Sequence, residues 1–498
     1  MTEQQTPLDQ ASNVPGNSIF DLIQTGVPGL DMLLNGGLPI GALLLVVGSP
    51  GTGKTVLANQ ICFNLATNGN GRALFFSTLS EPHDKMVRQL RSFTFYDPSC
   101  LGDSVILLAL QEFLKQGLEA TAEVIVRTTR QQQARLVCID GYRALEAICQ
   151  SEVESRQFLY QLSAQLHVLG ATLLVTLERD GTDRDDYGAY TVADGVLICH
   201  HELLGMQRRR KIEVKKLRAM AHMQGLHSYR ITADGWTVFP RIEMLVPAET
   251  SNASPRKVVE RQQFGIRELD HMLDGGIPAG SAMLIVGGPG VGKTLLGLHY
   301  LSEGLRQSEP SLFVGFNERR EQLIEKARQF GLPLAEAAQS GLIRIRTFAP
   351  VEIEPDEISS AIRHEIESHS IRRMVIDATF ELERATAREA RAHDYMGALV
   401  TYLRDVGVTV CMTKLINKFG ADGIDFSDTP LSVVAENLLL LQHFTYESAQ
   451  RYVIAILKMR DSNYDQHSYE YSIDDHGVRI HNRFERASKR STTLDDLS

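Results

Sequence analysis

The sequence predicts an α/β fold of two tandem domains, each a mostly parallel β-sheet with helices on both faces and a β-meander at one edge. Three observations predict it. The first half of the chain recurs in the second, strand-like apolar runs alternate with helix-like runs, and short strands with turns close each half. We expect disordered tails at 1–18 and 486–498, domains at 19–246 and 261–485, and a linker at 247–260.

The repeat has a constant spacing. Gly26 and Lys54 correspond to Gly265 and Lys293, which lie 239 positions later in both cases. The matched segments before the loops are Thr25-Gly26-Val27-Pro28-Gly29-Leu30-Asp31 with Phe264-Gly265-Ile266-Arg267-Glu268-Leu269-Asp270, and Gly36-Gly37-Leu38-Pro39 with Gly275-Gly276-Ile277-Pro278. Two homologous domains in tandem explain this pattern.

Each half carries one match to the nucleotide-binding loop pattern G-x-x-x-x-G-K-[ST]. The two loops are Gly48-Ser49-Pro50-Gly51-Thr52-Gly53-Lys54-Thr55 and Gly287-Gly288-Pro289-Gly290-Val291-Gly292-Lys293-Thr294. An apolar strand-like run precedes each loop and a helix-like run follows it, so the helix N-terminus faces the bound anion. Backbone amides and the lysine are expected to hold phosphates, and Thr55 and Thr294 to meet Mg²⁺. An ordinary Gly-rich turn is a poor alternative for two such matches.

The other elements follow in alternation. In the first half we expect strands at 72–79, 105–109, 134–140 and 171–177, helices at 84–93, 119–133 and 155–169, and a meander at 195–200, 209–217, 228–232 and 237–239. In the second half we expect strands at 311–316, 373–377 and 407–414, a helix at 321–330, and a meander after Glu436.

Composition restricts the class of protein. The 498 residues carry a net charge of −10, which argues against a protein that mainly coats nucleic acid. The six cysteines lack C-x-x-C spacing, and we interpret them as reduced core residues rather than a metal cluster or disulfide frame. No apolar run approaches the ~18 residues of a spanning helix, and the start is polar. We therefore expect a cytoplasmic protein without a membrane anchor.

Acidic residues close two strands in equivalent places. Asp140 and Asp377 end the runs Val137-Cys138-Ile139-Asp140 and Met374-Val375-Ile376-Asp377. Triphosphate hydrolysis needs such an acid beside the Mg²⁺ shell, and an acid that aligns water. Glu81 and Glu318 follow the preceding strand in each half and are our candidates for that catalytic role. The alternatives are a strand-end turn for the aspartates and a solvated helix start for the glutamates.

Basic residues also recur. Lys216 and Arg218 in Lys216-Leu217-Arg218 match Lys458 and Arg460 in Lys458-Met459-Arg460. On a strand, alternation places both cations on one face. They are either solvated residues that guard an exposed edge or contacts to the phosphates of a nucleotide held by a neighbouring subunit.

These motifs together resemble the KaiC family of RecA-like ATPases, over roughly residues 19–485. The resemblance implies two RecA-like P-loop domains, a double-layered homohexamer, and ATP with Mg²⁺ at the subunit interfaces. It also implies that Lys216, Arg218, Lys458 and Arg460 reach the adjoining subunit's ATP. ATP hydrolysis in a signalling or timing switch, with unidentified regulatory partners, is the function it implies.

Three departures from the family pattern qualify these implications. The family's circadian members carry two adjacent glutamates, where this chain has Ser80-Glu81 and Asn317-Glu318. They autophosphorylate an adjacent Ser-Thr pair, which here reads Ser432-Val433, so serine autokinase activity would use Ser432 alone. An ordinary turn serine is the alternative. The chain ends soon after Arg490, so a partner-binding tail like that of the clock members would be shortened or altered.

Two other functions stay open at this point. A DNA-dependent recombinase or helicase motor needs a basic lumen with aromatic stacking partners, and Arg208-Arg209-Arg210-Lys211 has no interleaved aromatics. A nucleotide-gated scaffold with little catalysis would explain the single glutamates. We expect no nucleic-acid partner.

Overall fold

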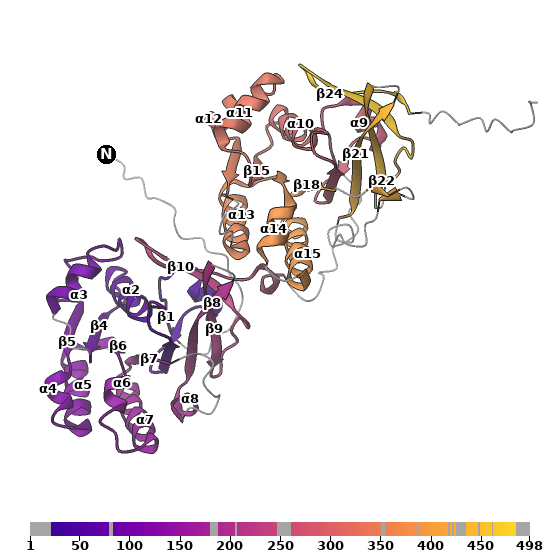
Figure 1. Ribbon diagram of the computed structural model, residues 1–498. Helices are drawn as coiled ribbons and strands as arrows, with labels where there is room; N and C mark the ends of the chain where they lie inside the picture. Colours follow the sequence, from indigo (N-terminus) through magenta and orange to yellow (C-terminus); the bar gives the residue numbers. More distant parts are fainter. Residues whose placement is uncertain are drawn as a thin grey trace, which may run out of the picture. The chain divides into compact units, whose positions relative to one another are not determined.

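The computed structural model describes residues 21–78, 83–179, 188–204, 207–246, 260–349, 354–386, 389–416, 419–420, 423–424, 435–446, 449–460 and 462–484. The chain divides into two compact units, the first ending at Pro240 and the second beginning at Arg241 (Figure 1). No helix within the described ranges is long and apolar enough to cross a membrane.

The first unit is organised around a sheet with nine strands among its described residues. In sheet order these are β11 (Gly235–Phe239), β10 (His227–Thr232), β9 (Gln207–Leu217), β8 (Gly195–Leu204), β3 (Leu43–Gly48), β7 (Thr172–Glu178), β6 (Ala134–Asp140), β4 (Arg72–Ser77) and β5 (Val105–Ala109). Strands β8 to β5 pair in parallel, whereas β8 to β11 form an antiparallel meander. This sheet confirms the predicted α/β class. The short strands β1 (Leu22–Ile23) and β2 (Leu38–Pro39) pair separately.

Helices cover both faces of this sheet. They are α1 (Leu30–Leu33), α2 (Lys54–Thr67), α3 (His83–Leu90), α4 (Gln111–Leu114), α5 (Leu118–Gln132), α6 (Arg143–Glu146), α7 (Glu152–Val168) and α8 (Gly188–Val192). Alternate residues of β3 enter two separate cores. Leu44 and Val46 pack with Leu57 of α2, while Leu45 and Val47 join the core that contains Leu159 of α7. A strand buried on both faces needs a continuous apolar run, which explains its sequence.

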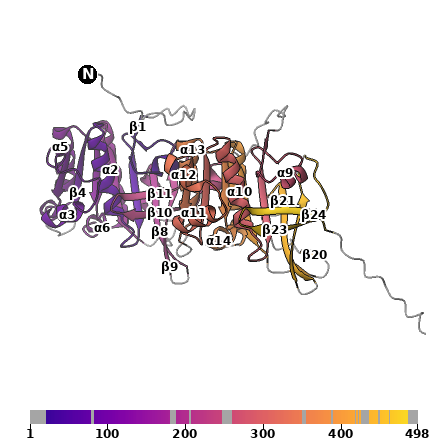
Figure 2. The ribbon, with the colours of Figure 1, turned by 90° about the horizontal axis from the view of Figure 1, so that it is seen from above.

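The second unit repeats this plan. In sheet order its strands are β16 (Ile343–Thr347), β15 (Ser311–Gly315), β17 (Arg373–Asp377), β18 (Thr409–Leu415), β14 (Ala282–Gly287), β21 (Asn437–Tyr446), β22 (Ala449–Lys458), β23 (Tyr469–Asp474) and β24 (Gly477–Arg483). The helical elements are η1 (Ile242–Met244), α9 (Arg267–Met272), α10 (Lys293–Arg306), α11 (Arg320–Gln329), α12 (Leu334–Ser340), α13 (Pro355–His369), α14 (Thr379–Ala385) and α15 (Glu389–Asp405). The small pairs are β12 (Arg261–Gln262) with β13 (Ile277–Pro278), and β19 (Phe419–Gly420) with β20 (Gly423–Ile424). Within this unit, the yellow meander lies at the opposite end from α11 and α12 in both views (Figures 1 and 2).

Several predicted boundaries are wrong, among them the start of the helix predicted at 155–169, which begins at Glu152. The helix predicted to run to residue 93 ends at Leu90, and the amide of Thr94 instead donates to the carbonyl of Ala233 in the meander, 2.9 Å away. The strands predicted at 195–200 and 209–217 extend towards each other, because backbone pairing continues past the apolar run. Glu202 lies opposite Arg209 in this extension, where opposite charges favour pairing.

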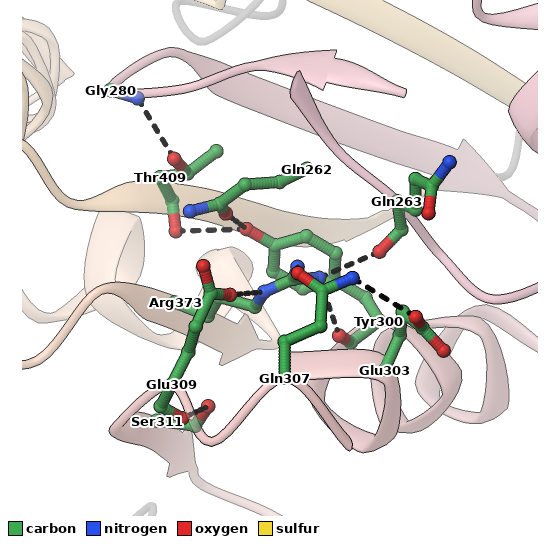
Figure 3. A network of polar contacts seen from close by, with 10 residues as sticks. All are labelled: Gln262, Gln263, Gly280, Tyr300, Glu303, Gln307, Glu309, Ser311, Arg373 and Thr409. Carbon is green, nitrogen blue, oxygen red and sulfur yellow. Dashed lines mark hydrogen bonds and ion pairs between the residues drawn. The ribbon is translucent and has the colours of Figure 1, made fainter. Parts of the chain in front are cut away.

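A buried arginine distinguishes the second unit from the first. Arg373 is fully buried and forms an ion pair with Glu309 (Figure 3). Its guanidinium donates to the carbonyls of Gln263 and Tyr300, at 2.6 and 3.1 Å, and to the side chain of Gln307 at 3.2 Å. It also lies 4.9 Å from the centre of the Tyr300 ring. These contacts join β17 to the C-terminal end of α10.

The equivalent position in the first unit is apolar. Leu136 lies four residues before Asp140 in β6, as Arg373 lies four residues before Asp377 in β17. Gly304 leaves room for the arginine, since a Cβ there would lie 2.5 Å from its Cδ.

We predict that Arg373→Leu lowers the free energy of unfolding of the second unit by about 3–5 kcal/mol, because Glu309 and two carbonyls lose their donor. Hydrogen exchange of α10 and β17 measures this. Arg328→Leu, which removes an exposed ion pair with Glu325, is the matched control and should leave exchange nearly unchanged. Equal effects of the two variants would contradict the prediction.

Candidate nucleotide sites

The first loop is shaped by its glycines and held by the meander. Gly51 and Gly53 have positive φ values of 81° and 91°. A Cβ on Gly53 would lie 2.2 Å from the Cδ1 of Ile231, so a larger residue does not fit. Trp236 donates from its indole nitrogen to the Gly53 carbonyl at 2.9 Å, and the hydroxyl of Tyr229 donates to the Thr52 carbonyl at 2.8 Å. Strands β10 and β11 thus fix the loop that precedes α2.

The loop lysines are cations that hydrogen-bond to neutral groups, with Lys54 buried and Lys293 half-buried. Lys54 is 7% exposed, and its ammonium donates to the carbonyls of Gly48 and Ser49, at 2.8 and 3.0 Å. Lys293 donates to the carbonyls of Gly287 and Gly288, at 3.0 and 2.5 Å. Burial lowers the pKa of both lysines, and this is opposed by Glu178 at Lys54 and by Asp377 at Lys293. Neither forms an ion pair within the described residues, so each charge is available to an anion.

The predicted metal residues of the first unit lie together. The hydroxyl of Thr55 donates to the carboxylate of Asp140, at 3.1 and 2.9 Å from its two oxygens. A third residue, Thr176 of β7, donates to Asp140 Oδ1 at 2.5 Å. Burial raises the pKa of Asp140, and the hydrogen bonds from Thr176 and Thr55 partly offset this.

The second unit reproduces the arrangement, with one threonine on each carboxylate oxygen of Asp377. Thr294 donates to Asp377 Oδ2 at 2.8 Å, and Thr413 of β18 donates to Asp377 Oδ1. The hydroxyl of Tyr471 donates to the Val291 carbonyl at 2.6 Å, as Tyr229 does to the first loop.

These residues fit a triphosphate with Mg²⁺. A Cβ on Gly290 would meet no heavy atom within 4 Å, so the loop has open space beside it. Hydroxyl and carboxylate oxygens are the hard ligands that Mg²⁺ prefers, and Thr55 with Asp140, or Thr294 with Asp377, supply them. The lysine beside them supplies the charge for phosphate.

The two candidate catalytic glutamates differ in what the structure describes. Glu81 lies outside the described residues. Glu318 follows β15, whose last residue Gly315 pairs with Asp377 of β17. Its carboxylate forms an ion pair with Lys326 of α11, while its Oε2 is buried without a hydrogen-bond partner. The structure therefore places Glu318 near the correct sheet edge but in contact with a lysine.

The basic residues of the first unit lie away from their own loop. Lys216 of β9 pairs with Val196 of β8, which pairs with Leu45 of β3. Lys216 is thus level with a residue three positions before Gly48, roughly 10 Å back along the strands. Its ammonium donates to the carbonyls of Tyr190 and Ala193, at 2.8 and 2.7 Å. Arg218 donates to the carbonyl of Thr191 at 2.7 Å.

The second unit has the same placement. Lys458 pairs with Leu438, which pairs with Leu284, again three positions before Gly287. The Lys458 ammonium donates to the carbonyl of Ala435 at 2.9 Å, and Arg460 is exposed. Ser432 lies outside the described residues.

Sequence reasoning missed three kinds of residue in these sites: the strand threonines, the meander residues that hold the loops, and a pair beneath them. Gln60 accepts the amide of Trp236 at 2.6 Å, and the equivalent His299 accepts the amide of Val478 at 3.2 Å. For the strand threonines the signal that was available is their recurrence in the second half. Thr413 follows Thr176 by 237 positions, the spacing that separates Asp377 from Asp140.

Comparison with known families identifies the chain. The family model described as "ATPase: KaiC" matches residues 23–243 and 262–485, which include both sites. This chain belongs to the KaiC family of ATPases. It is 31% identical to the circadian clock oscillator protein KaiC of Picosynechococcus sp., over 93% of this chain and 90% of the relative. It is 30% identical to the circadian clock oscillator protein KaiC 1 of Synechocystis sp., over 93% and 89%.

We expect His299 to make the second unit of this KaiC-family chain sensitive to acid. Burial lowers the pKa of His299 to about 4 from an ordinary 6.5. Between these values the unfolded chain binds a proton that the folded unit excludes, so stability is lost as pH falls from 6.5 towards 4. At pH 5 the loss is about 2 kcal/mol.

We predict that His299→Gln, which copies Gln60 of the first unit, removes this loss. Hydrogen exchange of α10 at pH 7.5 and pH 5, corrected for intrinsic rates, measures it. The reciprocal Gln60→His should introduce the same sensitivity into α2. An unchanged pH dependence in His299→Gln would show that another group is responsible.

Proposed function

We propose that this KaiC-family ATPase is an ATP-binding and ATP-hydrolysing switch protein that acts as a homohexamer in signalling or timing. The observation that carries the proposal is the pair of Lys–Thr–Asp arrangements, one at the carboxyl edge of each parallel sheet. The relatives carry the name of a circadian clock oscillator, which supports a timing role. Unidentified regulatory proteins would be its partners.

In the proposed mechanism, the loop amides with Lys54 or Lys293 bind the β- and γ-phosphates of ATP. Thr55 with Asp140, and Thr294 with Asp377, would hold Mg²⁺, which when bound would neutralise charge on the phosphates. Glu81 or Glu318 aligns the attacking water and accepts its proton. For Glu318 this requires release of the ion pair with Lys326.

Subunit contact is part of the proposal. Lys216 and Lys458 are each level with a residue well before their own loop, and their strands run away from it, so neither serves its own nucleotide. A ring in which Lys216, Arg218, Lys458 and Arg460 contact the neighbour's ATP gives these recurring cations a partner. The hydrogen bonds of Lys216, Arg218 and Lys458 to carbonyls can be exchanged for bonds to phosphate oxygens, and Arg460 is exposed.

Autophosphorylation of Ser432 is a further part of the proposed function. The family's neighbouring acceptor is Val433 in this chain, so a single phosphate per chain is expected. Its donor would be ATP at the second loop.

We predict that Lys54→Ala combined with Lys293→Ala abolishes ATP binding and ring assembly. Each lysine contributes about 2–3 kcal/mol to phosphate binding, or roughly 30- to 150-fold in affinity per site. Light scattering with ATP present measures assembly, and Lys115→Ala, an exposed lysine paired with Glu112, is the control. Unchanged hexamers in the double variant would refute assembly by nucleotide.

We predict that Glu81→Gln combined with Glu318→Gln slows phosphate release at least about 100-fold. Glu325→Gln on the exposed surface of α11 should have no effect on phosphate release.

Mass spectrometry of the same ATP incubation should find phosphate at Ser432 in the wild type. Equal, near-zero release by wild type and variant would favour a nucleotide-gated scaffold, and an unmodified Ser432 would remove the autokinase activity.

A further inference from the structure

Two buried threonines lie beside the metal-site aspartates. In the first unit β6 and β7 are parallel partners, with Ile139 opposite Val175, so Asp140 and Thr176 are the next residues along. In the second unit Ile376 lies opposite Met412, which places Asp377 beside Thr413. Thr176 is 2% exposed and Thr413 is fully buried. In both copies the pairing register of the sheet therefore places the threonine beside the aspartate.

The hydroxyl of Thr176 has a defined direction. It accepts a hydrogen bond from the amide of Gly141 at 3.0 Å. Its single proton goes to Asp140 Oδ1, 2.5 Å away. A hydroxyl has one donor only, so this contact uses it completely.

In the second unit the two carboxylate oxygens of Asp377 have different partners. Thr413 donates to Oδ1, and the loop residue Thr294 donates to Oδ2 at 2.8 Å. The strand threonine therefore leaves one oxygen facing the loop. In the first unit Thr55 reaches both oxygens of Asp140, and the nearer is Oδ2, which Thr176 does not contact.

We propose that Thr176 and Thr413 are positioning residues that set the Mg²⁺ affinity of the two nucleotide sites; this inference rests on the proposed ATP binding. The carboxylate torsion of aspartate is broad and roughly two-fold, so it needs an external partner to fix it. A β-branched threonine has a stiff χ1 and supplies a fixed donor. With the carboxylate held, Oδ2 stays directed at the loop hydroxyl where Mg²⁺ would be shared.

The same strands provide matched control residues. Thr172 and Thr409 lie four positions earlier on β7 and β18 and are fully buried. They contact backbone at the opposite edge of the sheet, where Thr172 donates to the Pro39 carbonyl at 2.9 Å and Thr409 accepts the Gly280 amide at 2.8 Å. Substituting them removes a buried hydroxyl without touching an aspartate.

The experiment measures the affinity of the full chain for a fluorescent ADP analogue, in EDTA and in Mg²⁺. The dissociation constant in EDTA divided by that in Mg²⁺ gives the factor by which the metal strengthens nucleotide binding. This ratio does not depend on turnover. We expect Thr176→Val with Thr413→Val to lower this ratio at least about 10-fold, with EDTA affinity unchanged. Serine at both positions should restore it, cysteine should give an intermediate ratio, and Thr172→Val with Thr409→Val should leave it unchanged.

Three results would overturn the inference. An unchanged ratio in the valine variant, with nucleotide still bound, refutes it and leaves the proposed function intact. Equal loss of affinity in EDTA and Mg²⁺ shows that the hydroxyls support the fold of the site. Absence of ADP binding by the wild type in both buffers removes the proposed function as well. If the valine variant fails to fold, the serine and cysteine variants decide the outcome.

Discussion

The hydrogen bond between a loop threonine and a strand-end aspartate is the contact on which the site architecture depends. These hydrogen bonds, Thr55 with Asp140 and Thr294 with Asp377, join the first turn of the helix after the loop to the strand that carries the aspartate. In sheet order that strand lies two places from the strand that precedes the loop. The loop can adopt this position only because parallel strands end at the same edge. The meander then holds the loop from its other side, through Tyr229 in the first copy.

The two copies keep this contact and differ away from it. Near the amino-terminal ends of the parallel strands, the first unit packs Leu136 of β6. At the equivalent place in β17 the second unit buries Arg373, which forms an ion pair with Glu309. Beneath the loop, Gln60 and His299 accept equivalent amides, but only the imidazole can gain a proton. The two copies therefore share the contacts at the carboxyl edge and differ in the supporting core.

Sequence reasoning reached the fold class, the loops and the strand-end acids because each depends on local pattern. Thr176 was missed because a threonine within an apolar run is also an ordinary strand residue. Trp236 contacts Gly53 across 183 positions, which no local pattern reports. Arg373 begins the predicted strand 373–377, but its burial was not predicted, because its partners Glu309 and the Gln263 carbonyl come from distant parts of the sequence. The extended β8–β9 hairpin depends on pairing between strands.

The most direct test of two independent triphosphate sites is the number of adenine nucleotides bound per chain at saturation. We expect two for the wild type and one for Lys54→Ala or Lys293→Ala alone, measured by equilibrium dialysis with a non-hydrolysable ATP analogue. Two nucleotides bound by either single variant, or none by the wild type, would contradict this expectation.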